Sequence, residues 1–365
     1  METHKIAPFD IGIVVFIGAL TGFLLEVPSG TVADRFSYRS LLVSSQFIRC
    51  LAFSSILFLP VLAMFAVTFF LLAFKETLVS GTTDALLFET LKRHKEEQNY
   101  VKYYGYEVVI RRAALIISAL LGAVLLPYGF EPLLIASVIS SSIGVVSALL
   151  ISEIERKGTK NRGKSRTTVQ VVISGLRKIR RNRVLAWHVC FDGVVGGLIA
   201  SLWSYWSIFG DKIGLPDIGI GLFAATINLC GMLAGLFATR HRDLSLKSFC
   251  LLCLLNSVLL GMAAALYSPI SGLLVLTFMF IFYYLTIMNE FWTQKLLSTS
   301  IRATVTSMTG LLAYFVQLVI ALPFGLISAS YGYQAGFLMV AGLYLVVVAA
   351  AIGVRYTPEL GIEEC

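Results

Sequence analysis

Residues 30–42 read Gly-Thr-Val-Ala-Asp-Arg-Phe-Ser-Tyr-Arg-Ser-Leu-Leu, a short polar turn between two long apolar stretches. The apolar stretch before the turn begins near residue 11, and the one after it ends near residue 59. Each is roughly 20 residues long, the length that an α-helix needs to cross the hydrocarbon core of a bilayer. We therefore expect the turn to join two transmembrane helices on one side of a membrane.

The rest of the chain has the same apolar character. Hydrophobic residues make up 57% of its 365 residues and charged residues only 14%, which excludes an ordinary soluble domain. The apolar runs are continuous rather than alternating, so they predict helices and exclude a membrane β-barrel. The sequence thus predicts an all-α integral membrane protein with eleven spans: 11–32, 41–59, 62–88, 104–127, 132–151, 184–208, 217–238, 247–266, 270–294, 303–328 and 334–354.

The basic residues indicate how the chain is oriented. The net charge is +8, and of the 29 Lys and Arg residues all but Lys5, Arg49, Lys75 and Lys212 fall on one side of the predicted membrane. This bias predicts a multi-pass cell-membrane protein (inner membrane in a Gram-negative bacterium) with cytoplasmic basic loops and C-terminus. The charge is then a topology signal, and nucleic-acid binding is not expected. The six cysteines lie in spans or at the C-terminus, so neither a disulfide framework nor a metal site is expected.

A long basic segment divides five spans from six. It predicts a bundle at 1–153, a linker at 154–183, a second bundle at 184–356 and a tail at 357–365. Within the linker, residues 169–183 combine helical apolar spacing with basic residues, which predicts a helix on the inner membrane surface attracted to anionic lipid. A disordered basic linker is an equal alternative for residues 156–168.

The two halves also share a motif. Gly30, Ala33 and Arg35 recur 205 residues later as Gly235, Ala238 and Arg240. Both sets end a predicted span and open a cytoplasmic loop. Together with the central basic segment, this repeat predicts two related bundles in parallel orientation.

The opening turn resembles the loop after the second helix of the major facilitator superfamily of transporters. Five residues match that family's loop signature: Gly30, Ala33, Asp34, Arg35 and Arg39. Ser37 and Tyr38 stand where the family usually has a glycine and a basic residue, and residues 80–89 resemble the fourth helix of prokaryotic members. The resemblance implies two pseudo-symmetric bundles that work by alternating access, with 11 helices (5+6) of the usual 12. Since only one predicted span precedes the turn, the helix that is lacking is the first.

The same resemblance implies a conformational latch at the turn. Its expected members are Gly30, Asp34, Arg35, Arg39 and Glu89. A carboxylate at this position can accept hydrogen bonds from a neighbouring helix N-terminus and pair with Arg. The alternative is a static cytoplasmic cluster of charges.

Polar residues inside the spans are candidates for a substrate or proton pathway: Glu26, Arg49, Lys75, Glu76, Asp192, Asn228 and Gln317. A charge at the bilayer centre costs roughly 2.5–3.5 kcal/mol on insertion scales, so each charged candidate should face a cavity or a partner. Glu26 shares a helix face with Gly18 and Gly22, which favours a position inside the bundle. The structural alternative is an ion pair of Arg49 with Glu26 or Glu76. Lys75 and Glu76 are adjacent, and we expect them not to pair ideally with each other.

Three further sets of residues have expected positions or partners in the membrane. His188 and Asp192 lie one helical turn apart and could form a solvated or proton-carrying pair. Trp203, Tyr205 and Trp206 are expected in an interfacial aromatic belt. Several charged residues near helix ends are expected at the interface: Asp84, Glu107, Arg111, Arg112 and Glu290.

The expected function is secondary transport, with no enzymatic activity and no cofactor. No nucleotide-binding or hydrolase motif is present in the sequence. We expect a monomer that couples protons to the efflux of a small, rather hydrophobic compound, because few charges lie near the membrane centre. The drug-antiporter motif of the family is missing, since Ser118–Ala123 contains no proline. A facilitator or uptake carrier of the same fold and a non-transporting membrane protein such as a sensor are the alternatives.

Overall fold

The computed structural model describes residues 7–33, 36–58, 61–79, 82–96, 99–152, 176–177, 179–241, 244–296 and 299–355. All regular elements within these residues are helices. The expected tail at 357–365 and most of the expected linker at 154–183 lie outside the described residues. Residues 176–177 and 179–181 of the linker are helical, with Leu176 exposed and Ile179 buried.

The first half of the chain contains α1 (Pro8–Ala33), α2 (Tyr38–Phe58), α3 (Leu62–Val79), α4 (Thr82–Arg93), α5 (Tyr100–Leu125), the 3₁₀ turn η3 (Leu126–Tyr128) and α6 (Phe130–Leu150). The second half contains α8 (Arg183–Leu202), the 3₁₀ turn η4 (Trp203–Tyr205), α9 (Trp206–Lys212), α10 (Asp217–Arg240), α11 (Leu246–Leu266), α12 (Pro269–Leu296), α13 (Thr299–Tyr331) and α14 (Tyr333–Arg355). Eleven stretches of the described chain are long and apolar enough to cross a membrane, which confirms the predicted count. The predicted span at 62–88 corresponds to two helices, α3 and α4.

Short polar residues set several helix starts. Asn182 Oδ1 accepts a hydrogen bond from the Leu185 amide at 3.1 Å, and Ser245 Oγ accepts one from the Ser248 amide at 3.1 Å. These caps satisfy amides that have no partner within the helix. The turn between α13 and α14 contains Gly332, whose φ of 86° suits a residue without a Cβ.

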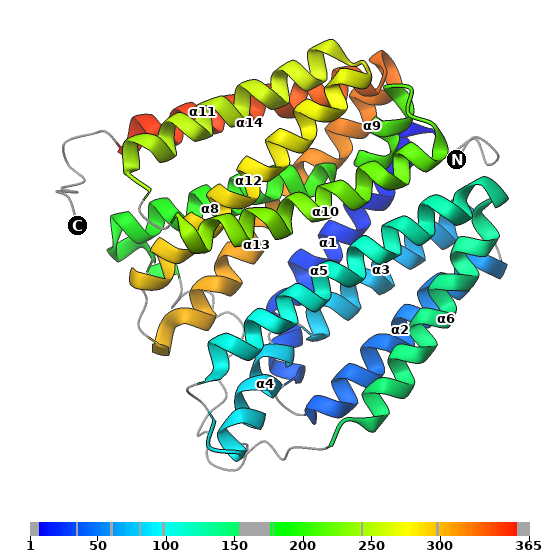
Figure 1. The fold of residues 1–365 in the computed structure, drawn as a ribbon, viewed down its shortest axis with the longest axis vertical. Coiled ribbons are helices and arrows are strands. Elements are labelled where there is room, and N and C mark those ends of the chain that lie inside the picture. The colour runs from blue at the N-terminus through cyan, green and yellow to red at the C-terminus, as the bar shows by residue number, and fades with distance from the viewer. Residues whose placement is uncertain are drawn as a thin grey trace.

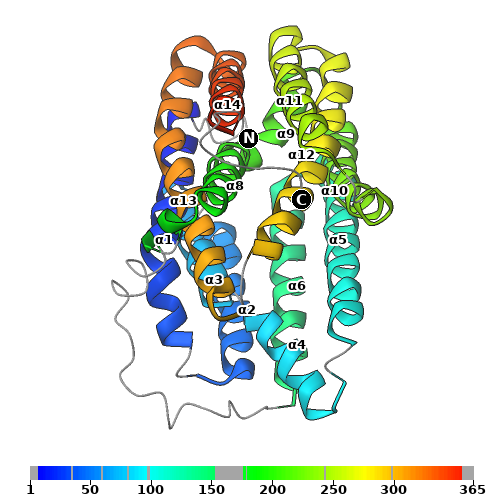
Figure 2. The ribbon, with the colours of Figure 1, turned by 90° about the vertical axis from the view of Figure 1, so that its left-hand side faces the viewer.

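The helices form two lobes with the same internal arrangement (Figures 1 and 2). In the first lobe α3 packs between α1 and α2, and α2 packs along α6; in the second, α12 packs between α10 and α11, and α11 packs along α14. The helices α1 and α10 therefore occupy equivalent places, and the Gly30 and Gly235 motifs lie near their equivalent ends. The lobes meet along two helix pairs, α1 with α13 and α5 with α10. Since α1 corresponds to α10 and α5 to α13, the pseudo-symmetry maps one pair onto the other. This crossing pattern supports the predicted pseudo-symmetry.

The helix α8 breaks the symmetry. It packs against α13 and also touches α12 and α14, and 61% of its apolar stretch is buried. In the described part of the first lobe no helix occupies the equivalent place beside α5, of which only 6% is buried. Apolar side chains such as Ile110, Ile117 and Val124 of α5 are accordingly more than half exposed. Among the described residues, the first lobe thus has five spans and the second six.

The aromatic residues at the end of α8 do not form the expected belt. Tyr205 and Trp206 are buried, at 0% and 4% exposure, and only Trp203 is exposed. The Tyr205 ring centroid lies 4.2 Å from that of Phe324, and the Trp206 centroid lies 5.9 Å from that of Phe337. The 3₁₀ turn η4 rotates these side chains into the core of the second lobe, a local change that helical periodicity does not predict.

Candidate functional site

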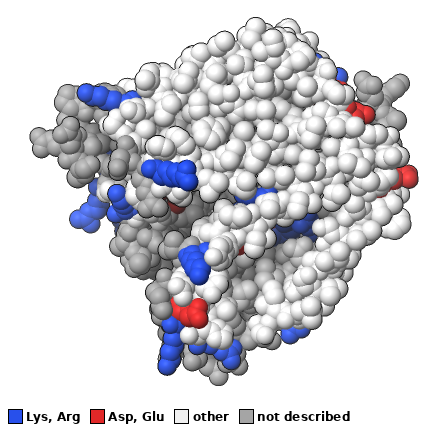
Figure 3. All heavy atoms as spheres, viewed as in Figure 1, with Lys and Arg blue, Asp and Glu red and all other residues white. Residues whose placement is uncertain are grey.

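The space between the two lobes is the candidate site. On the face seen in Figure 3, Lys and Arg side chains lie in a furrow between the lobes, while the outer surfaces of both lobes carry few charges. The lobes are closely packed at the ends of α5 and α10 remote from Arg240: a Cβ atom on Gly221 would lie only 2.6 Å from Cα of Ala123. An equivalent contact joins Gly12 of α1 to Gly325 of α13, where an added Cβ would lie 3.0 Å from the opposite Cα.

Four residues gather where α1, α3 and α13 meet. Tyr314 of α13 lies against Gly22 of α1, where an added Cβ would lie 2.7 Å from Cδ1 of the tyrosine ring. Both Glu26 and Glu76 lie within electrostatic reach of the Tyr314 hydroxyl group. Lys75 Nζ lies 2.6 Å from Glu76 Oε1, with the lysine side chain 12% exposed and the glutamate side chain 59% exposed. The structure therefore joins three predicted pathway residues and adds a tyrosine from the opposite lobe.

The Lys75–Glu76 contact corrects the expected pairing. Adjacent helical side chains point about 100° apart, but the long lysine stem spans that difference. The expected partner, Arg49, instead places its guanidinium 5.8 Å from the centroid of Phe53 on its own helix. In the part of the chain that the structure describes, no carboxylate lies within salt-bridge distance of Arg49, so the alternative of an ion pair with Glu26 or Glu76 is not observed.

A second charged group lies across the other lobe junction. The guanidinium of Arg112, on α5, stands 4.9 Å from the ring centroid of Tyr283 on α12. A Cβ atom on Gly231 of α10 would lie 3.0 Å from Nη1 of the same arginine. Gly231 is residue 15 of the 24 in α10, and Tyr283 is residue 15 of the 28 in α12, so Arg112 reaches the middle of both helices. Its expected position at a membrane interface is therefore wrong.

The position of Arg112 carries a free-energy cost. A cation at the bilayer centre costs roughly 2.5–3.5 kcal/mol on insertion scales. The contact of the Arg112 guanidinium with the Tyr283 ring stabilises it by only about 0.5–2 kcal/mol. No carboxylate of the described residues lies within salt-bridge distance of the Arg112 guanidinium. By contrast, Nε of the neighbouring Arg111 lies 3.2 Å from Oε1 of Glu107, and the Arg111 side chain is 60% exposed.

Two uncharged candidates have structural partners. Gln317 Nε2, on α13, donates a hydrogen bond to the carbonyl oxygen of Ala200 on α8 at 3.2 Å. Asn228 Nδ2 donates to the carbonyl oxygen of Ala224 in its own helix at 3.0 Å, and its Oδ1 is buried without a partner among the described residues. Gln317 thus links two helices of the second lobe, while Asn228 keeps an acceptor unused inside the protein.

His188 does not pair with Asp192. Its Nδ1 lies 2.7 Å from Asn289 Oδ1, and Asn289 Nδ2 donates to the His188 carbonyl oxygen at 3.2 Å. Because the amide oxygen can only accept, His188 Nδ1 is the donor. Both side chains are buried, at 2% and 0% exposure, so this reciprocal pair fastens α8 to α12. Asp192 instead lies within electrostatic reach of Glu290 on α12.

Replacing Asn289 should destabilise the second lobe. Asn289→Ala removes both hydrogen bonds that this side chain makes with His188 across the contact between α8 and α12. We expect a loss of about 1–3 kcal/mol in the free energy of unfolding. Thermal unfolding of the detergent-purified chain, followed by tryptophan fluorescence, measures this loss. Thr286→Ala, which removes one hydrogen bond to the Tyr283 carbonyl within the same helix, is the control and should cost less. Equal losses would contradict the role assigned to Asn289.

The expected latch is only partly visible. Gly30 lies in the last turns of α1, Arg39 in the first turn of α2 and Glu89 on α4. Asp34 and Arg35, the two residues that define the signature, lie outside the described residues. The latch therefore stays a prediction.

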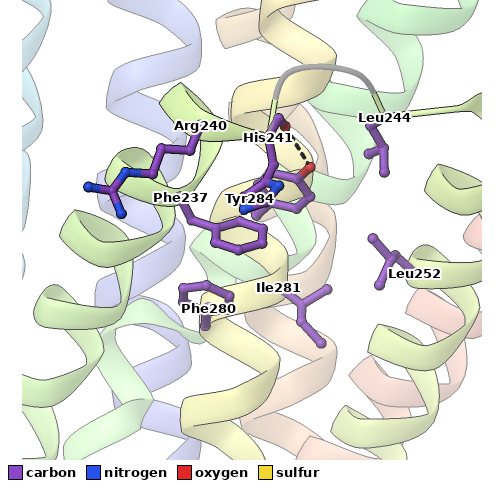
Figure 4. A pocket seen from close by; sticks show the side chains of 8 residues that line it. All are labelled: Phe237, Arg240, His241, Leu244, Leu252, Phe280, Ile281 and Tyr284. Atoms are coloured by element: carbon purple, nitrogen blue, oxygen red, sulfur yellow. Dashed lines mark hydrogen bonds between the residues drawn. The ribbon is translucent and has the colours of Figure 1, made fainter.

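Two pockets lie within the second lobe rather than between the lobes. One, of about 490 Å³, lies between α10, α11 and α12 and is lined by aromatic rings beside Arg240 (Figure 4). There the Tyr284 hydroxyl donates to the His241 carbonyl oxygen at 3.0 Å. The other, of about 640 Å³, lies between α8 and α14 around Trp187. Neither contains a candidate pathway residue.

Sequence reasoning missed four residues that shape the site and its surroundings: Tyr314, Arg112, Tyr283 and Asn289. Tyr314 and Tyr283 look like ordinary aromatic residues of apolar spans, and nothing in the sequence shows which glycine each approaches. Arg112 had a signal, because it lies ten residues inside the stretch that begins at Lys102, or about 15 Å along a helix. A charge at that depth is as costly as Glu76 and marks the same kind of candidate.

Fold and site together define a multi-pass helical membrane protein of two pseudo-symmetric lobes with charged groups at their junction. The sequence matches the profile of the Major Facilitator Superfamily over residues 1–322, and the chain belongs to this family. No protein in a comparison with curated proteins matches it.

Solved structures of membrane transporters share this fold. A point mutant of the nucleoside transporter NupG superposes with a TM-score of 0.72 at 14% sequence identity, covering 96% of this chain and 92% of NupG. A bacterial homologue of the human lysosomal transporter Spinster, solved in an inward-facing and unoccupied conformation, gives a TM-score of 0.67 at 14% identity, covering 98% and 92%. At this identity the likeness shows the fold alone.

Proposed function

We propose that this protein is a secondary transporter that works by alternating access and moves a small, rather hydrophobic compound out of the cell in exchange for protons. The observation that carries the proposal is the junction itself. Within the described residues, two lobes of equivalent arrangement meet chiefly along two helix pairs, and charged side chains lie beside both. Such an arrangement can rock about a central site without disturbing the core of either lobe.

Glu76 is the carboxylate best placed to carry the coupled proton. It is exposed at the junction, next to a nearly buried lysine and within reach of Tyr314. Protonation would release Lys75 from its partner and change the charge at the junction. Glu26 and Asp192 are further candidates for the proton pathway, and Arg49, Asn228 and Gln317 for substrate contacts.

Removing the Glu76 charge should abolish coupling. We expect Glu76→Gln to reduce substrate-driven proton movement at least tenfold, because the amide cannot exchange a proton and leaves Lys75 without a counter-charge. The assay uses vesicles that contain the purified chain and the pH indicator pyranine, with a panel of aromatic amines, carboxylates, neutral aromatic compounds and nucleosides added outside.

Glu131→Gln is the matched control, since Glu131 is an exposed carboxylate in the first turn of α6. It should leave proton movement unchanged. Wild-type vesicles in which no compound moves protons would contradict the coupled mechanism, and undiminished coupling in Glu76→Gln would remove this residue from it.

A facilitator or uptake carrier of the same fold is the second candidate. It is favoured by the structural likeness to NupG, which is a nucleoside transporter. Counterflow of a labelled nucleoside in vesicles without a proton gradient would support it. A non-transporting role predicts neither counterflow nor proton movement with any member of the panel.

We also propose a topology, an oligomeric state and a lipid contact for this protein. We place the basic loops and the C-terminus in the cytoplasm of the cell and expect a monomer. Anionic lipid headgroups would meet the end of the linker at 169–183, where Arg177, Arg180 and Arg181 are exposed. The latch at Gly30, Asp34, Arg35, Arg39 and Glu89 would hold the lobes together on that side in one state of the cycle.

A further inference from the structure

We infer that Arg112 is an anion-binding group of the transport pathway, and that the substrate is an organic acid: an apolar body with a carboxylate or a similar anionic group. This inference rests on the proposed transport function and names its substrate class.

The cation lies where the two lobes meet. Arg112 belongs to the first lobe, yet its guanidinium lies against Gly231 and Tyr283 of the second. Both contacts are near the middle of their helices. A solute that moved between the lobes along α5 and α10 would therefore meet this group.

The two junctions differ in their balance of charges. At the junction of α1 and α13, Glu76 has Lys75 as its counter-charge. At the junction of α5 and α10, Arg112 has a tyrosine beside it but no carboxylate partner in the described chain. A planar guanidinium keeps several N–H donors in a fixed fork, more than the one phenol oxygen of Tyr283 can accept. A carboxylate, phosphate or sulfonate accepts the donors of such a fork in a bidentate manner.

The walls of this site are formed by Gly231, Tyr283 and Cys230. Gly231 leaves room for the guanidinium because it has no side chain. Tyr283 provides an aromatic surface, and the neighbouring buried Cys230 adds a small apolar side chain. An apolar molecule with one anionic group would place its charge on Arg112 and its body against these surfaces.

A structural role is the competing explanation, in which Arg112 only braces the lobes through Tyr283. The two explanations differ in one respect. If Arg112 only holds the lobes together, its replacement should change the affinity for all ligands alike. If it binds anions, its replacement should weaken the binding of a carboxylate but not of an alcohol of the same shape.

The test compares ligands that differ only in charge. The purified full chain in detergent is titrated with 1-naphthoate, 1-naphthylmethanol and 1-naphthylmethylamine and with the corresponding octyl compounds. Binding is measured from the shift of the thermal unfolding midpoint. We expect the carboxylates to bind wild type most tightly, and Arg112→Gln to weaken their binding by about ten- to a hundredfold with little effect on the alcohols.

Arg111→Gln is the matched control, because Arg111 is the adjacent cation on the same helix and is already paired with Glu107. It should bind the carboxylates like wild type, and Arg112→Lys should retain part of the affinity. Alcohols or amines that bind wild type as tightly as the carboxylates would overturn the inference. Equal carboxylate binding by Arg112→Gln and wild type would do the same. If Arg112→Gln does not fold, the comparison of ligands on wild type and Arg112→Lys decides.

Failure of the inference and failure of the transport function are separable. Vesicles that transport the alcohols or amines but not the carboxylates would refute the anion site and leave transport intact. Carboxylates that bind through Arg112 but are never transported would support the site and refute transport.

Discussion

Gly197→Leu should prevent the second lobe from folding normally. A Cβ atom at this position of α8 would lie 2.6 Å from the carbonyl oxygen of Ala313 and 3.0 Å from its Cα, both in the backbone of α13. Backbone atoms cannot rotate away as a side chain can, so α8 would have to move off α13. Overpacking of this kind costs about 3 kcal/mol or more, and α8 belongs to the most buried of the eleven spans.

The neighbouring glycine provides the control. A Cβ atom on Gly196 meets no heavy atom within 4 Å, so Gly196→Leu should be tolerated. Replacing glycine within a helix should even stabilise it, by up to about 1 kcal/mol. The yield of monodisperse protein in detergent and its thermal unfolding midpoint measure both effects. Equal behaviour of the two variants would show that α8 and α13 are less closely packed than described.

The fold was largely predictable from the sequence because lipid permits few alternatives. A bilayer requires each spanning segment to satisfy its own backbone hydrogen bonds, so length and hydropathy alone give the number of membrane-spanning segments. The recurrence of Gly30 and Ala33 as Gly235 and Ala238 likewise predicted two equivalent lobes. The boundary between α3 and α4 was not predicted, because the predicted span at 62–88 runs across it and ends inside α4.

The site was predictable only in its charged residues on the α1 side. Glu26, Lys75 and Glu76 stand out because charges inside an apolar span are costly. Their partners depend on tertiary contacts: Tyr314 comes from the opposite lobe, and Glu76 pairs with its sequence neighbour rather than with Arg49. His188 illustrates the same limit, since its spacing to Asp192 suggested a pair within one helix, while its actual partner Asn289 lies 101 residues away.

Gly221→Leu should hold the lobes apart at the ends of α5 and α10 remote from Arg240. A Cβ atom there would lie 2.6 Å from Cα of Ala123, and a leucine would extend further into α5. The helix α10 also packs along α12, so we expect the second lobe to keep its fold. The conformational equilibrium should then favour the state that is open on this side, and the cycle should slow at least tenfold.

Labelling of a cysteine placed at Ala123 tests this shift directly, in a background whose six native cysteines are replaced by alanine. Ala123 is 3% exposed, so Ala123→Cys alone should react slowly with a membrane-impermeant maleimide. Combined with Gly221→Leu, it should react at least ten times faster. Gly235→Leu is the matched control on the same helix, because a Cβ atom on Gly235 meets no heavy atom within 4 Å. If the introduced thiol reacts equally slowly beside Gly221→Leu and beside Gly235→Leu, the contact between Gly221 and Ala123 does not close this side of the protein.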